Sequence, residues 1–234
     1  MEHISNNVFF GIIISLVAFE IGLYIRKKTK LDIFNPLLIA IALVIIFLLI
    51  FNIDVSDYSK GADFINMFLG PATIVLAVPL YKQLHSLKKY LIPILSGVFI
   101  GSVICIFSVI ILCIVLKLDE SIKVSLLSKS VTTPIGIEIT NSLGGISSIT
   151  ILSIVLTGIV GSVIGPSICK VFKIKNEIAI GLALGTSAHA VGTSKALELG
   201  EVQGAMSSLS IGIAGLMTVF LAPLLYNITI SIIG

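Results

Sequence analysis

The hydrophobic positions of this chain gather into long runs, and the charged positions fall almost entirely between those runs. The clearest run covers residues 33–51 and contains no charged side chain. Runs of roughly 19 to 27 residues match the length that a helix needs to cross about 30 Å of hydrocarbon. The pattern therefore predicts an all-α integral membrane protein with several transmembrane helices, and it excludes a soluble enzyme.

Eight segments follow from these runs and their interruptions. About six are predicted to be transmembrane helices, at residues 7–25, 33–51, 63–81, 90–116, 146–170 and 204–232. The polar stretch 52–63 is predicted to be a loop outside the cell. The remaining two segments, at 122–145 and 178–203, contain too many Ser, Thr and charged residues to face lipid. We expect these two to form polar helical hairpins, either broken or re-entrant.

Basic side chains cluster in three loops, at residues 26–30, 82–89 and 170–175. Because cytoplasmic loops of membrane proteins carry an excess of Lys and Arg, we expect all three clusters to face the cytoplasm. A full crossing by 122–145 would place 170–175 outside, whereas a hairpin that enters from outside and turns back keeps it inside. The charge pattern therefore favours re-entry, with 178–203 entering from the cytoplasmic side.

Two stretches of the chain resemble each other. LSGVFIGSVI at 95–104 and LTGIVGSVIG at 156–165 share Gly-Ser-Val-Ile after an earlier glycine, and they run in opposite directions in the predicted topology. This is the pattern of an inverted-repeat transporter. Close packing of small residues between unrelated helices is the alternative. We expect one transmembrane domain over 1–234, with N-terminal spans in 7–116 and a hairpin-containing half in 122–232.

The first polar segment contains a candidate anion site. Thr133-Pro134 predicts a helix start and Gly144-Gly145 its end, which leaves a helix of about half a bilayer in length. The N-terminus of such a helix at membrane depth presents free N–H groups and a positive dipole end to an anion. The candidate substrate-binding residues before and at this point are Lys129, Ser130, Thr132 and Thr133. The alternative is an ordinary loop with a capped interfacial helix.

The second polar segment repeats Gly-Thr-Ser at 185–187 and at 192–194. If the segment is one helix, Thr186, His189 and Thr193 lie on one face. The candidate substrate-binding residues here are Thr186, Ser187, His189, Thr193 and Ser194. Two alternatives stay open: the small residues serve only helix packing, or the glycines break the segment into two half-helices.

Two titratable groups are candidates for coupling transport to a proton. His189 is costly in lipid unless it is paired, so we expect it to bind substrate or a proton. Glu138 lies one turn into the helix of the first polar segment. Sodium coupling is equally open. Lys195 and Glu198 are three residues apart, and mutual neutralisation is the simplest interpretation of that pair.

Composition agrees with a membrane protein and indicates no further chemistry. Hydrophobic residues make up 56% of the chain and charged residues 12%, about half the charged share of a soluble domain. The three cysteines lie in apolar spans without CxxC spacing, so we expect packing roles, with no disulfide and no metal site. No catalytic constellation is present, and we expect neither an enzyme nor a cofactor.

Three blocks of the sequence resemble the LrgB/CidB family, and the similarity extends over essentially the whole chain. The blocks are KSVTTPIGIEI (129–139), LGGISSITILSIVLTGIVGSVIGP (143–166) and GLALGTSAHAVGTSKALELGEVQGAMSSLSIGIAGL (181–216). The family is named for holin/antiholin-like control of murein hydrolases and lysis, and it pairs with small LrgA/CidA-type membrane proteins. It also resembles the plastid glycolate/glycerate translocator, and bacterial members are linked to small carboxylates such as pyruvate.

The resemblance and the residue pattern together lead to one main expectation and one alternative. The main expectation is a multi-pass transporter in the cell membrane that moves glycolate, glycerate, lactate or pyruvate by alternating access, with substrate held between 130–136 and 186–194. The alternative is a holin/antiholin-like protein that acts with an LrgA-type partner. We further expect a homodimer in the lipid bilayer and no nucleic-acid partner.

Overall fold

A computed structural model describes residues 7–29, 34–68, 71, 74, 81 and 88–233. Within these residues it contains nine helices and no strands, which confirms the predicted all-α class. Four of the helices are long and apolar enough to cross a membrane, and a fifth apolar helix is shorter. Most of the predicted span 63–81 and most of the basic loop 82–89 lie outside the described residues.

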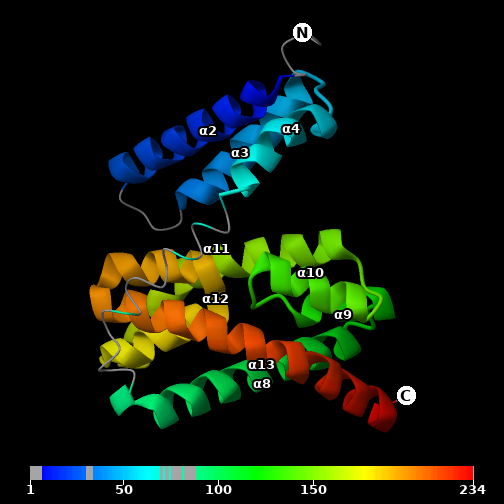
Figure 1. The fold of residues 1–234 in the computed structure, drawn as a ribbon, viewed down its shortest axis with the longest axis vertical. Coiled ribbons are helices and arrows are strands. Elements are labelled where there is room, and N and C mark those ends of the chain that lie inside the picture. Colours follow the sequence, from blue (N-terminus) through cyan, green and yellow to red (C-terminus); the bar gives the residue numbers. More distant parts are fainter. Residues whose placement is uncertain are drawn as a thin grey trace. The chain divides into compact units, whose positions relative to one another are not determined.

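The chain divides into two compact units, Met1–Val75 and Leu76–Gly234. The helices of the first unit are α2 (Val8–Thr29), α3 (Pro36–Ile50) and α4 (Val55–Asn66) (Figure 1). Helices α2 and α4 approach closely at Gly11 and Gly61, where an added side chain would collide with the facing backbone. Ser15 and Tyr58 hydrogen-bond across this contact at 2.8 Å.

The prediction of a loop over 52–63 is wrong, because most of this stretch belongs to α4. In the sequence VSDYSKGADFIN, polar residues alternate with residues on the helix face that packs against α2. Packing of this face against a neighbouring helix stabilises α4 despite the low hydrophobicity of the segment.

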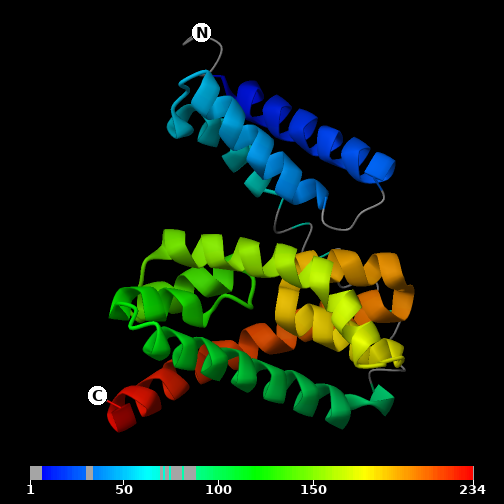
Figure 2. The same cartoon turned by 180° about the vertical axis from the view of Figure 1, so that it is seen from behind.

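The helices of the second unit are α8 (Leu91–Val115), α9 (Glu120–Leu127), α10 (Thr133–Ser142), α11 (Ser147–Val171), α12 (Glu177–Leu199) and α13 (Glu201–Ile233). Helices α8 and α13 cross in both views (Figures 1 and 2), and they are in contact. Their contact belongs to an apolar cluster that includes Ile106, Ile110 and Ala222. This unit contains both polar segments.

Helices α9 and α10 form a helical hairpin. They have 8 and 10 residues, or about 12 and 15 Å, so neither can cross a bilayer alone. Ser128, at the end of α9, donates to the Gly136 carbonyl early in α10, and Ile146 beyond α10 donates back to Ser125. The two helices are therefore antiparallel, as expected for a re-entrant segment.

Helix α12 is also a hairpin, because its backbone breaks at His189 (φ 40°, ψ −129°). In a continuous helix Gly192 would lie about 12 Å along the axis from Leu184. Instead, a side chain on Gly192 would collide with the Leu184 carbonyl oxygen. The limb after His189 therefore folds back along the limb before it.

Helix α13 packs against both limbs of α12. It runs parallel to the first limb, where Gly181 lies against Gln203 and Gly185 against Ser207. It runs antiparallel to the second limb, where Leu197 lies against Gly204. These contacts hold the hairpin closed.

The second unit thus alternates long helices with hairpins in the order α8, α9–α10, α11, α12, α13. The matching motifs at 95–104 and 156–165 lie in α8 and α11, and each of these helices precedes a hairpin. This order agrees with two re-entrant hairpins, while the inverted repeat stays a prediction.

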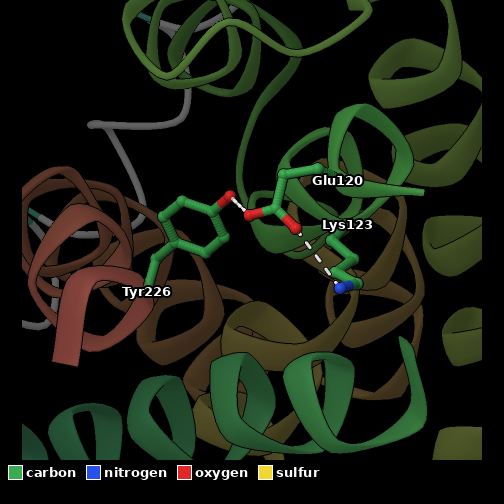
Figure 3. A network of polar contacts seen from close by, with 3 residues as sticks. All are labelled: Glu120, Lys123 and Tyr226. Carbon is green, nitrogen blue, oxygen red and sulfur yellow. Dashed lines mark hydrogen bonds and ion pairs between the residues drawn. The ribbon is translucent and has the colours of Figure 1, made fainter. Parts of the chain in front are cut away.

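A polar network ties the start of the first hairpin to α13 (Figure 3). The hydroxyl of Tyr226 donates to Glu120, and Lys123 forms an ion pair with the same carboxylate at 3.2 Å. The hydrogen bond from Tyr226 is the main cause that lowers the pKa of Glu120 below its ordinary value; partial burial opposes this effect and Lys123 adds to it.

The hairpin topology predicts that Lys173, exposed after α11, faces the cytoplasm. We expect a Lys173→Cys variant, in a background without the three native cysteines, to react with a membrane-impermeant thiol reagent only after the cells are opened. A cysteine at Asp119, between α8 and α9, is the matched control and should react in intact cells. Labelling of position 173 from outside would contradict re-entry by 120–142.

The network at Glu120 predicts a small, pH-dependent contribution to stability. Tyr226→Phe should lower the free energy of unfolding by about 0.5–1.5 kcal/mol, towards the low end because the Glu120 side chain is 55% exposed. Since folding lowers the pKa of Glu120, its stabilisation is present above the unfolded value of about 4.3 and is lost as the pH falls through the folded value. Thermal unfolding in detergent at pH 7 and pH 3.5 measures this, with the exposed Tyr24→Phe as control. An equal effect of Tyr226→Phe at both pH values would contradict it.

Candidate functional site

The second unit contains a cavity of about 770 Å³ between α8, the first limb of α12 and the turn of the α9–α10 hairpin. Tyr90 and Asn176 line it at the start of α8 and of α12. Thr186 lies nine residues into α12, or about 14 Å, which is close to half the thickness of the hydrocarbon. The cavity therefore extends from the starts of α8 and α12 to a point about 14 Å along α12.

The turn of the α9–α10 hairpin supplies the polar end of the cavity. Lys129 and Ser130 lie in this turn, and both line the cavity. The Lys129 ammonium donates to the Ser130 hydroxyl at 3.3 Å and to the Cys105 sulfur at 3.6 Å. The Cys105 sulfur and the Ser130 hydroxyl oxygen are also hydrogen-bonded to each other, at 3.0 Å. These three side chains bring α8 and the hairpin turn together around one positive charge.

The opposite wall is formed by α12, which contributes Thr186 and Ser187. Helices α8 and α12 come close because α8 has a glycine at the crossing: a Cβ on Gly101 would lie 3.1 Å from the Thr186 methyl group. The sequence places a small residue here, and the approach of the two helices follows from it.

The charge and polarity of the cavity suit a small anion. Among the described residues that line it, Lys129 is the one charged side chain, and hydroxyls of Ser130, Thr186 and Ser187 accompany it. Most of the other lining residues are apolar. A small monocarboxylate offers two acceptor oxygens to an ammonium and to hydroxyl donors, and a short carbon chain to the apolar part.

The structure therefore brings together four of the predicted site residues: Lys129 and Ser130 from one hairpin, and Thr186 and Ser187 from the other. Two further candidates, Thr132 and Thr133, lie at the start of α10 and do not line the cavity. Thr132 is the N-cap, one residue before the position expected from the sequence.

The remaining candidates on α12 lie elsewhere. His189 is 4% exposed, and its Nε2–H donates to the Ile154 carbonyl on α11 at 2.9 Å. Thr193 is fully buried between the His189 carbonyl and the Ser207 hydroxyl. Ser194 is exposed and donates to Ala190. The predicted common face of Thr186, His189 and Thr193 is not formed, because the backbone turns at His189.

Three charged residues singled out in the sequence lie outside the cavity: Glu138, Lys195 and Glu198. Glu138 is exposed on α10, so its role in ion coupling stays a prediction. Lys195 and Glu198 form an ion pair at 3.3 Å, as expected. No group of side chains that could hold a metal ion occurs in the described part of the chain.

The sequence interpretation missed Cys105 as a cavity residue. All three cysteines were expected to pack in apolar spans, and Cys113 and Cys169 are buried in this way. Cys105 instead contacts Lys129. The sequence contains no signal for this contact, because 24 residues separate the two side chains.

Comparison with known proteins finds one family, and its similarity covers nearly the whole chain. A model of the LrgB-like family matches residues 15–228. The antiholin-like protein LrgB of Bacillus subtilis (strain 168) is 41% identical over 216 residues, 92% of this chain and 94% of its own length. The antiholin-like protein LrgB of Bacillus cereus (strain B4264) is 39% identical over 217 residues, with the same coverage. No solved structure matches the chain.

The position of His189 predicts a structural role at the hairpin turn. His189→Ala removes the donor to Ile154 and leaves a void beside Gly158, so we expect the free energy of unfolding to fall by about 1–3 kcal/mol. Ser194→Ala, at an exposed position on the second limb, is the control and should change little. The measurement is thermal unfolding in detergent. A His189→Ala protein of wild-type stability would contradict this structural role.

Proposed function

This chain belongs to the LrgB-like family, and on that premise we propose that it acts in the cell membrane as an antiholin-like protein. The role is supported by relatives that share about 40% of its residues over 92% of its length, which are antiholin-like LrgB proteins. A small LrgA-type membrane protein is the expected partner, and a homodimer the expected assembly.

The geometry favours a second function, the transport of small monocarboxylates, and one observation carries it. Lys129 places an ammonium group in a mostly apolar cavity whose wall reaches Thr186, about 14 Å along α12. Under the predicted topology this point lies near the middle of the membrane, where a charge costs several kcal/mol unless it lies in a water-filled cavity or meets an anion. A carboxylate bound there offsets that cost, which gives the cavity selectivity for anions.

The two hairpins offer a mechanism for alternating access. Residues at the starts of α8 and α12 line one end of the cavity, and the contact of Lys129, Ser130 and Cys105 lies at its inner end. Under the predicted topology the end at the starts of α8 and α12 faces the cytoplasm. Movement of the α9–α10 turn away from α8 would open the inner end towards the other side, while Lys129 keeps hold of the carboxylate.

The transport function predicts a specific loss on mutation of Lys129. Proteoliposomes with the purified protein should take up labelled glycolate or pyruvate, and Lys129→Ala should raise the substrate concentration for half-maximal uptake by about 10- to 100-fold. This range follows from about 1.5–3 kcal/mol for a hydrogen bond to a charged group. Lys28→Ala, at an exposed lysine at the end of α2 in the first unit, is the matched control and should behave as the wild type.

One outcome would separate the two functions, and another would test the binding site alone. Wild-type proteoliposomes that take up no more substrate than empty ones would refute transport and leave the antiholin-like role. Uptake that is unchanged in a well-folded Lys129→Ala protein would leave transport standing but remove Lys129 from the binding site.

A further inference from the structure

One buried hydroxyl in the second unit has no partner. Ser102 on α8 is 4% exposed, and its Oγ is the buried side-chain oxygen without a hydrogen-bond partner among the described residues. Buried polar groups in folded proteins almost always have partners, because an unpaired one is costly. We therefore expect the hydrogen-bond partner of Ser102 to come from outside the chain.

Ser102 lines a second, much smaller cavity of about 10 Å³. This volume is at the lower limit for one water molecule or one hydroxyl group. Four hydroxyl-bearing side chains line it, from α8, the hairpin turn, α12 and α13: Ser102, Ser130, Thr186 and Thr218. Thr218 donates to its own helix at Ala214, so its oxygen remains able to accept.

The small cavity adjoins the large cavity near Lys129. It shares three lining residues with the large cavity, namely Cys105, Ser130 and Thr186. The Lys129 ammonium is 3.3 Å from the hydroxyl of Ser130, which borders both cavities. A cation in the small cavity would be repelled by this ammonium, so a neutral group fits better.

We propose that the small cavity binds the hydroxyl group on carbon 2 of a carboxylate held at Lys129, with Ser102 as its hydrogen-bond partner. The oxygen on carbon 2 lies two bonds from the carboxylate carbon, within roughly 3 Å. A carboxylate on the Lys129 side of Ser130 therefore places this oxygen at the boundary of the small cavity. Ser102 both donates and accepts, which matches a hydroxyl group.

This inference rests on the proposed carboxylate site, and it makes Ser102 a specificity-determining residue. An acid without the 2-hydroxyl group leaves Ser102 unpaired, so it should bind more weakly. A site built to hydrogen-bond a hydroxyl discriminates against the analogue that lacks it.

The test compares glycolate with acetate, which differ only in the 2-hydroxyl group. Dissociation constants are measured by calorimetry on the full-length protein in nanodiscs. The wild type should bind glycolate about tenfold more tightly than acetate. Ser102→Ala should weaken glycolate binding by about the same factor and leave acetate binding unchanged. Since the change removes an unpaired oxygen, folding should be preserved. Ser96→Ala, an exposed serine on the same helix, is the control and should match the wild type.

Each other outcome contradicts a different step. Equal wild-type affinity for glycolate and acetate would overturn the inference and leave the carboxylate site intact. A Ser102→Ala protein that loses both ligands equally would also overturn it, because Ser102 would then support the site as a whole. Unchanged glycolate binding in that variant would mean that the cavity holds only water. A wild type that binds neither acid would refute the carboxylate site itself.

Discussion

The structure depends on how an interrupted helix is accommodated inside a membrane. Hydrocarbon offers no partner for the backbone groups that a break leaves free, so a break must be enclosed by protein or line a cavity. Both interruptions in the second unit meet this condition. The turn after α9 lies against α8 beside the cavity, and the break at His189 is held by α11 on one side and α13 on the other.

Burial within the second unit also divides its hydroxyl groups into two kinds: those that hydrogen-bond inside the packing, and those that line the cavity and are available to a ligand. Within the first hairpin, Ser128 and Thr140 bond to each other and onward to Thr150 of α11, all of them fully buried. These bonds fix the two short helices against a long one. The turn between the short helices is then held in place, and it presents Lys129 and Ser130 to the cavity. A rigid support of this kind is what a selective binding site requires.

The cavity and the family relationship describe different levels of function. The antiholin-like role concerns what the protein does in the cell, and it needs only a membrane protein with suitable partners. The proposed transport function concerns what the molecule binds, and it rests on a half-buried ammonium beside hydroxyls in a cavity. Such a charge costs stability in an apolar environment, so its placement in a cavity supports the proposal of a bound anion.

The sequence by itself determined the membrane class, most of the helices and the two polar hairpin segments, because hydrocarbon thickness and the cost of polar groups act on each segment separately. Only the tertiary structure decided which polar residues meet. A continuous helix, one of the alternatives that the sequence left open, would place Thr186, His189 and Thr193 on one face. The backbone instead turns at His189 and directs Thr193 into the packing with α13. Thr186 and Lys129 instead line one cavity across 57 positions of sequence, because both hairpins lie against α8.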